Sequence, residues 1–250
     1  LGTVPLREIG ELIDSPKMFQ FYFHKDRALN DAMIDLAIQA KFDVLTLTVD
    51  TITGGNRERD LRTGFTTPPR LTPSSLFQFG IKPAWALNFL LRERFELSQL
   101  KDHVKQGSNI AISVGDYFST MLDQTLDWSH AEDLKRKWNG KFCLKGIMSK
   151  EDAKRAIDIG ADAIMISNHG GRQLDGSASP FDQLEEIADY VSGKIDLICD
   201  GGIRRGTHML KALSLGANAC SGGRLYLYAL AAGGQKGVEK SIQNLRNELL

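Results

Sequence analysis

The stretch SNHGGRQLDG, residues 167–176, places a histidine and an arginine on either side of two glycines. It follows directly on the apolar run AIMI at 163–166, which has the composition of a buried strand. The two glycines alone are enough to make a turn. His169 and Arg172 are not needed for that turn, and their side chains suit proton transfer and anion binding. The stretch therefore indicates chemistry at the end of a strand.

Two further glycine turns, DGGIRRG at 200–206 and SGGR at 221–224, also follow apolar runs. Consecutive glycines let backbone N–H groups approach a phosphate, and the helix that follows each turn directs its positive end toward it. Arg204 and Arg224 can neutralise the phosphate charge. Because (β/α) barrels bind phosphate at their last two strands, this pair of turns predicts a phosphate site.

The elements that must position these residues alternate along the chain. A helical pattern followed by a strand-like run recurs at 31–50, 152–171 and 209–224, and other strand-like runs lie at 18–23, 141–146 and 196–202. Helical spacing of apolar residues covers about 26–40, 150–159, 180–192, 206–214 and 234–249. Apolar strands that alternate with helices predict a parallel sheet covered on its faces.

Polar residues gather at the C-terminal ends of these strands, which favours a (β/α)8 TIM barrel over an open doubly wound sheet. In a barrel all such ends meet on one face, where active sites lie. The GxGxxG fingerprint of a dinucleotide-binding sheet is also missing from the sequence. The residues at these ends are Gln20, Tyr22, Thr48, Asp50, Lys145, Ser167, His169, Asp200 and Arg224.

The composition is that of a soluble globular protein. The 250 residues are 42% hydrophobic, and 31 basic side chains balance 31 acidic ones, so the net charge does not recruit nucleic acid. Cys143, Cys199 and Cys220 lie in apolar runs without metal-ligand spacing, which predicts reduced core cysteines of a cytoplasmic protein and no metal site. No run approaches the roughly 20 apolar residues that span a bilayer.

Between about residues 60 and 134 the periodicity fades and prolines interrupt the chain, which predicts an inserted excursion within a single domain over 1–250. Its tract PAWALNFLLRERF, 83–95, is apolar and then basic. One interpretation is a helix of an active-site lid that packs on the barrel. The other is a peripheral contact with a membrane surface, at the inner face of the membrane.

The ordered set of motifs resembles the FMN-dependent α-hydroxy-acid oxidases and dehydrogenases, a family that includes glycolate oxidase, L-lactate dehydrogenase and mandelate dehydrogenase. Any one motif is modest evidence, but all stand in the order of the family and cover nearly the whole chain. They are FQFYFHKDR at 19–27, LTVDT at 47–51, GNRERD at 55–60, LKGI at 144–147, SNHGGRQLDG and DGGIRRG.

The resemblance implies catalytic and substrate-binding roles. His169 matches the base that takes a substrate proton, and Asp50 matches the carboxylate that pairs with it. Arg172 and Arg57 match the residues that hold the substrate carboxylate, with Arg59 as a rival to Arg57. Tyr22 matches a phenol that hydrogen-bonds the substrate, and alternation along the strand puts it on the same face as Gln20.

The resemblance also implies a site for FMN. Lys145 matches the lysine beside the flavin N1–C2 carbonyl, where a fixed ammonium stabilises the reduced ring. Hydrogen bonds to the ring and the ribityl chain are implied for Gln20, Thr48, Ser167 and Asp200. The 5′-phosphate would be held by Gly202, Arg204, Gly223 and Arg224.

Against the family pattern, the sequence lacks a first barrel strand and most of a second, so we expect six full strands. Gly2 stands where many members have a serine that touches the flavin. We therefore expect the 250-residue segment to bind FMN poorly.

The expected reaction is the oxidation of a lactate-like L-2-hydroxy acid to the 2-oxo acid, in a protein expected to be a homo-oligomer by resemblance. A quinone or a cytochrome is favoured as electron acceptor, and oxygen, with hydrogen peroxide as product, is the second candidate. Two more hypotheses stay open: a related FMN or phosphate-binding barrel enzyme such as an isopentenyl diphosphate isomerase, and an inactive fragment that keeps a phosphate-ligand site.

Overall fold

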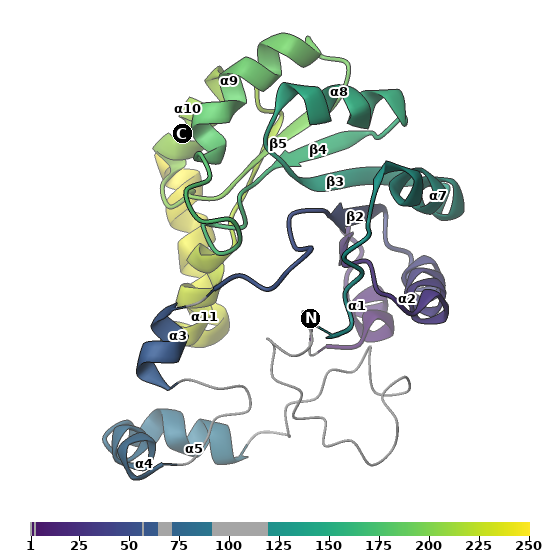
Figure 1. Ribbon diagram of the computed structural model, residues 1–250. Helices are drawn as coiled ribbons and strands as arrows, with labels where there is room; N and C mark the ends of the chain where they lie inside the picture. The colour runs from purple at the N-terminus through teal and green to yellow at the C-terminus, as the bar shows by residue number, and fades with distance from the viewer. Residues whose placement is uncertain (1, 3, 57, 65–71, 92–119) are drawn as a thin grey trace. The chain divides into compact units, whose positions relative to one another are not determined.

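The computed structural model of the protein describes residues 2, 4–56, 58–64, 72–91 and 120–250 (Figure 1). The chain forms two compact units. One comprises Leu1–Ser15, His24–Lys41 and Asn56–Leu122, and the other comprises Pro16–Phe23, Phe42–Gly55 and Asp123–Leu250. Apart from Arg59, the second unit contains all the described residues that the sequence places at the site.

A parallel sheet of six strands is the centre of the second unit. The strands are β1 (Met18–Phe21), β2 (Val44–Thr48), β3 (Lys141–Ile147), β4 (Ala163–Ile166), β5 (Asp196–Asp200) and β6 (Ala219–Ser221). Each strand pairs in parallel with the next along the chain, so the order in the sheet is the order in the sequence. This sequential order is typical of a (β/α) barrel, whereas a doubly wound sheet reverses direction at a switch point.

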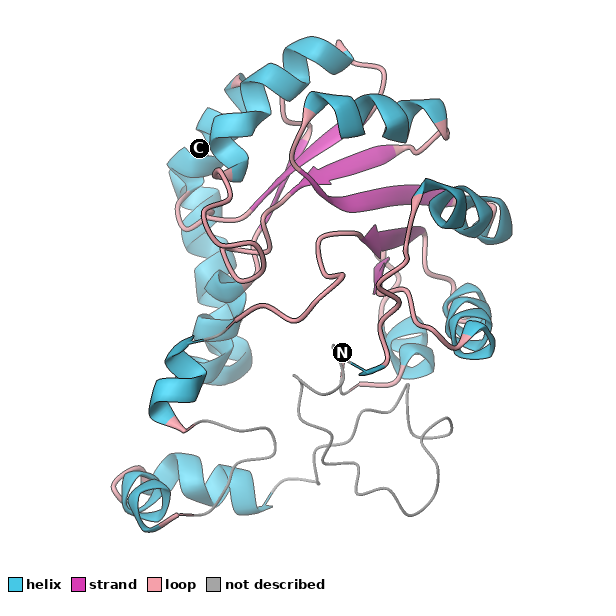
Figure 2. Ribbon diagram, viewed as in Figure 1, coloured by secondary structure: helices cyan, strands magenta, loops and turns pink. Residues whose placement is uncertain are grey.

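Helices cover the convex side of this curled sheet (Figure 2). They are α7 (Trp128–Trp138), α8 (Lys150–Asp158), α9 (Pro180–Val191), α10 (Gly206–Ser214) and α11 (Arg224–Leu249). Side-chain caps define several of their starts: Ser149 accepts from Asp152 N, and Ser179 accepts from Asp182 N. The capped helices α8 and α9 each connect one strand of the sheet to the next.

The strands divide their side chains between two environments. Leu45, Leu47, Leu144 and Ile164 are fully buried, as expected for the layer between strands and helices. Residues of the opposite parity become polar toward the strand ends, as in Thr48 and Lys145, which are direct partners in the β2–β3 register. The alternation therefore delivers polar groups to one edge of an otherwise apolar sheet.

The first unit is helical in its described part. It contains α1 (Leu6–Leu12), α2 (Arg27–Gln39), α3 (Glu58–Thr63), α4 (Pro73–Gly80) and α5 (Pro83–Leu91). The helices α1 and α2 contact each other, as do α4 and α5. None of the helices in the described ranges of the chain is long and apolar enough to cross a membrane.

The structure differs from the sequence expectations at several boundaries. α7 begins at Trp128, inside the range that the sequence assigns to the excursion. The sequence pattern does not indicate this helix, because charged residues separate its apolar positions. The last helix begins at Arg224 rather than near 234, and non-helical backbone at Gly233 and Gly234 breaks it. Helix α1 has no counterpart among the expected elements. The single-domain organisation stays a prediction, since 92–119 lie outside the described residues.

Candidate active site

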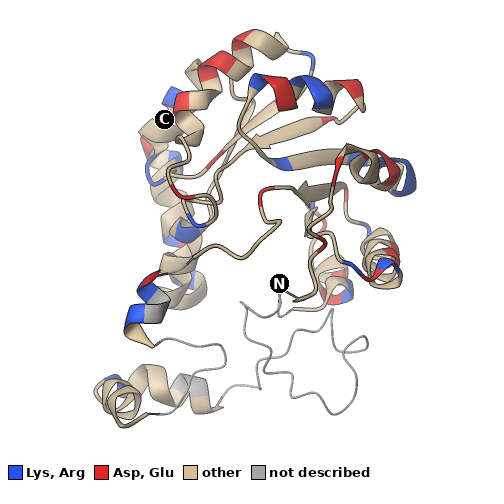
Figure 3. Ribbon diagram, viewed as in Figure 1, with Lys and Arg blue, Asp and Glu red and all other residues tan. Residues whose placement is uncertain are grey.

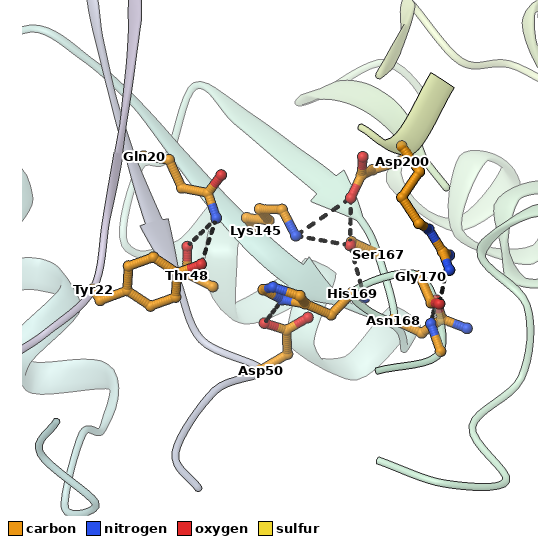
Figure 4. A network of polar contacts seen from close by, with 12 residues as sticks. Gln20, Tyr22, Thr48, Asp50, Lys145, Ser167, Asn168, His169, Gly170 and Asp200 are labelled. Atoms are coloured by element: carbon orange, nitrogen blue, oxygen red, sulfur yellow. Dashed lines mark hydrogen bonds and ion pairs between the residues drawn. The ribbon is translucent and has the colours of Figure 1, made fainter. Parts of the chain in front are cut away.

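His169 and Asp50 come together at the C-terminal edge of the sheet (Figure 4). His169 follows β4 and Asp50 follows β2, and the imidazole Nδ1 lies 3.0 Å from Asp50 Oδ1. A carboxylate only accepts hydrogen bonds, so a neutral imidazole here carries its one proton on Nδ1 and has a lone pair on Nε2. The side chains are 19% and 13% exposed, so the pair is shielded but within reach of a small molecule.

The backbone at His169 is held in an uncommon conformation. Its φ is +59°, and Gly170 and Gly171 continue the left-handed turn at +67° and +71°. Asn168, which the sequence interpretation missed, stabilises the turn: its Oδ1 accepts from Gly171 N and its Nδ2 donates to Ala178 O, both at 3.0 Å. Asparagine in a glycine turn is the signal that would have identified it.

Lys145, Ser167 and Asp200 form a connected, largely buried group. Lys145 Nζ donates to Ser167 Oγ at 3.0 Å and lies 3.3 Å from Asp200 Oδ2. Ser167 Oγ donates to the same Asp200 oxygen at 2.6 Å and accepts from His169 N at 3.1 Å. The hydroxyl thus uses its proton and both lone pairs on protein groups. The predicted contact of Ser167 with the ring would require one of these bonds to be given up.

Gln20, Tyr22 and Thr48 form a third polar group from β1 and β2. Gln20 Nε2 lies 3.1 Å from Tyr22 Oη and 3.2 Å from Thr48 Oγ1 and donates to both. This contact places Gln20 and Tyr22 on the same face, as the alternation along the strand predicts. Thr48 is buried, whereas Gln20 is exposed and its amide is accessible to a ligand.

The two glycine turns lie where the sequence predicts them, before α10 and α11. The φ of Gly202 is +73°, and a Cβ at Gly202 or Gly223 would meet no atom within 4 Å, so each turn borders open space. The N-cap residue of neither helix caps it with its own side chain. At α10 the N–H of Gly206 donates instead to Glu248 Oε2 at 2.6 Å. Arg204 is exposed, and its backbone N lies 3.3 Å from His208 Nδ1.

The arginines are less tightly placed than the other predicted residues. Arg224 donates to the carbonyl of Gly170 at 2.7 Å and so contacts the turn that carries His169. Arg172 is exposed at the rim, and Arg57 lies outside the described residues. A side chain at Gly55 would collide with the backbone carbonyl of Arg172, so only glycine lets the loop after β2 pass there.

Six consecutive parallel strand–helix units, with polar residues at one strand edge, define the chain as part of a (β/α)8-barrel protein. The chain belongs to the family of FMN-dependent dehydrogenases, whose model matches residues 1–250. This match confirms the resemblance inferred from the motifs, and the FMN expected from the sequence is the cofactor that the family is named for.

Two curated relatives illustrate the similarity. An L-lactate oxidase of Nostoc sp. (strain PCC 7120) is 40% identical over 258 residues, which cover 100% of this chain and 64% of the relative. An L-lactate dehydrogenase of Xanthomonas campestris pv. campestris (strain 8004) is 36% identical over 250 residues, again 100% and 64%. The chain therefore spans somewhat less than two thirds of the length of these relatives.

Solved structures confirm the fold class. A crystal structure of (S)-mandelate dehydrogenase, described as a monotopic membrane protein, superimposes with a TM-score of 0.91 at 32% identity, covering 99% of this chain and 65% of the other. A putative lactate oxidase of Pediococcus acidilactici gives 0.77 at 33% identity, with 99% and 59% covered. The fold is thus an incomplete (β/α)8 barrel, as the strand pattern predicts.

Proposed function

We propose that the protein oxidises a lactate-like L-2-hydroxy acid to the 2-oxo acid with FMN as cofactor. The observation that carries the proposal is the His169–Asp50 hydrogen bond of 3.0 Å on the same sheet edge as the buried Lys145. The names of the relatives, L-lactate oxidase, L-lactate dehydrogenase and (S)-mandelate dehydrogenase, support the substrate class.

The donor set on this edge fits FMN. Lys145 is only 7% exposed, and its ammonium suits a ring that gains negative charge. The exposed amide of Gln20 can accept from a ring N–H through Oε1, since Nε2 donates to Tyr22 and Thr48. Asp200 can accept from a ribityl hydroxyl, and the open space beside Gly202 and Gly223 suits a phosphate. When bound, FMN supplies the two-electron acceptor that the side chains lack.

His169 takes the substrate proton at Nε2, because Asp50 fixes the proton of the ring on Nδ1. Asp50 also stabilises the imidazolium once it has formed. Arg172, together with Arg57, binds the substrate carboxylate through the paired N–H groups of a guanidinium. Tyr22 Oη hydrogen-bonds the substrate.

Anaerobic flavin bleaching tests the reaction. The FMN-loaded protein is mixed with L-lactate, glycolate or mandelate, and absorbance near the long-wavelength flavin band is followed. We expect bleaching with L-lactate, a loss of at least about 100-fold in rate for His169→Gln, and little change for His130→Gln, a control in α7. Equal bleaching rates for His169→Gln and the unsubstituted protein would contradict the assignment of the base.

We propose further that a quinone or a cytochrome reoxidises the flavin. The L-lactate dehydrogenase relatives and the mandelate dehydrogenase structure support this, whereas the L-lactate oxidase relative favours oxygen as the second candidate. Stopped-flow reoxidation with oxygen or with a soluble quinone separates the two. Fast reoxidation by oxygen with stoichiometric hydrogen peroxide would establish that the protein is an oxidase.

The segment 83–95 is proposed as a peripheral membrane contact. Its described part is α5, where Leu87, Leu90 and Leu91 are 58%, 75% and 82% exposed; residues 92–95 lie outside the described residues. The monotopic mandelate dehydrogenase supports this interpretation. Leu90→Glu with Leu91→Glu should abolish co-sedimentation with anionic vesicles, whereas Leu12→Glu with Ile13→Glu, at exposed sites near α1, should not. Unchanged sedimentation of the first variant would favour the lid interpretation.

A further inference from the structure

A β-bulge interrupts β3 beside the candidate site. Lys145 pairs with Met165 of β4, and the next pair is Ile147 with Ile166, so two residues of β3 oppose one residue of β4. The extra residue is Gly146, whose φ is +109°. Paired residues of neighbouring strands point to the same face of the sheet. In a regular strand Lys145 and Ile147 would point to one face, but the bulge places their side chains on opposite faces.

The bulge also brings Gly146 directly against Asp50. A Cβ at Gly146 would stand 2.7 Å from Asp50 Cβ, 2.9 Å from its Cγ and 3.0 Å from its backbone N. Non-bonded carbon atoms prefer separations of about 3.5–4.0 Å. The backbone segments that carry Gly146 and Asp50 cannot easily move apart, because Val49 N donates to the carbonyl of Lys145 at 2.8 Å. Any side chain at position 146 must therefore displace the carboxylate of Asp50.

We propose that Gly146 is a positioning residue: its missing side chain lets Asp50 reach His169. The inference rests on the proposed function for its meaning, because that function uses the His169–Asp50 pair. Gly146 itself touches neither substrate nor cofactor in this assignment. Its effect reaches the histidine only through the Asp50 carboxylate.

Nitrogen NMR of the histidine ring measures this effect without any cofactor. The protein, labelled with 15N in its five histidines, is compared with Gly146→Ala and Asp50→Ala, and the His169 signals are assigned by their loss in His169→Gln. We expect the unsubstituted protein to show an Nδ1-protonated ring. The Gly146→Ala signals should move toward those of Asp50→Ala, and unchanged signals would overturn the proposal.

Gly193→Ala is the matched control. Gly193 has a φ of +75° in the loop between α9 and β5, and a Cβ there would meet no atom within 4 Å. This substitution also places a side chain at a positive φ but without the collision, so it should lower stability and leave the His169 signals in place. If Gly193→Ala shifts those signals as Gly146→Ala does, strain rather than contact is the cause and the proposal fails.

A second measurement applies if Gly146→Ala folds too poorly for NMR. Asp50→Gly removes the Cβ and Cγ that the new methyl group would strike, so Gly146→Ala should lower the thermal midpoint less in that background than in the unsubstituted protein. Equal lowering in both backgrounds would overturn the proposal. These results are independent of turnover: absence of flavin bleaching would refute the proposed function while leaving the NMR outcome to decide this inference.

Discussion

Lys145 and Asp200 allow a quantitative test of how the polar edge is stabilised. The two side chains are 9% and 13% exposed, with Nζ 3.3 Å from Oδ2, and Ser167 bonds both. Removal of one partner of a buried ion pair costs about 3–5 kcal/mol, because the other charge stays buried. Ser167 still hydrogen-bonds the remaining charge, and some water reaches it, so the loss should be smaller. We expect the free energy of unfolding to fall by about 2–3 kcal/mol for Asp200→Asn and by about 1–2 kcal/mol for Lys145→Met.

The double variant distinguishes this reasoning from simple loss of contacts. With both charges removed, no uncompensated ion is left. The methionine and asparagine side chains also have volumes similar to those of the lysine and aspartate that they replace. The double variant should therefore cost no more than the larger single substitution, which implies a coupling free energy of at least about 1 kcal/mol. Urea unfolding measures it, with Trp85 replaced by Phe so that Trp128 and Trp138 of α7 report on the second unit.

Additivity would refute the argument. If the double variant loses the sum of the two single losses to within about 0.5 kcal/mol, the charges do not interact across the 3.3 Å separation. A change in the urea m-value would show instead that the variants alter how much surface unfolding exposes. The same variants loaded with FMN report on function, because loss of the ammonium should make the flavin harder to reduce.

Three further outcomes are expected. Partial burial raises the pKa of Asp162, but hydrogen bonds from Lys141 Nζ and Phe142 N outweigh it and leave that pKa lowered. Asp162→Asn should therefore lower the free energy of unfolding by about 1 kcal/mol near pH 7. The melting temperatures of the variant and the parent should converge as the pH falls through the lowered pKa. Burial lowers the pKa of His24, so the melting temperature should fall as pH drops below about 6.5, and His24→Gln should flatten that dependence. Asn168→Ala should slow flavin bleaching by L-lactate at least about 10-fold, since it frees the turn that carries His169, with far-UV circular dichroism unchanged.

The sequence predicts most of the second unit because its strands are short apolar runs that end in recognisable polar residues. β4 and β5 have the expected bounds to within two residues. The sequence pattern does not predict α7, because only three of its residues are buried, Ala131, Leu134 and Trp138. Three apolar positions among charged residues are too few to make a clear periodic pattern. The start of the last helix was missed because two glycines interrupt it, and glycine normally indicates a helix end.

At the candidate site, the sequence predicts a set of side chains but not the contacts that hold them in place. The contact between His169 and Asp50 joins residues 119 positions apart, and only the motif order of a family indicates it. The roles of Gly146 and Gly55 depend on distances of close approach, which no spacing rule contains. Charged residues of both signs are also mixed along α7 and α8 (Figure 3). Their number and balance in the sequence therefore do not indicate where the polar edge of the sheet lies.

The arrangement of supports explains why the turn that carries His169 can be strained. A histidine at φ +59° is unfavourable by itself, and such a conformation persists only where neighbours over-determine it. Here the turn is tied from three directions: Ser167 accepts from His169 N, Asn168 accepts from Gly171 N, and Arg224 donates to Gly170 O. Because Arg224 belongs to the second glycine turn, a phosphate bound there would compete for the guanidinium that also holds the histidine turn. In the proposed function, binding of the cofactor phosphate would therefore be linked to the geometry of the proposed base through one side chain.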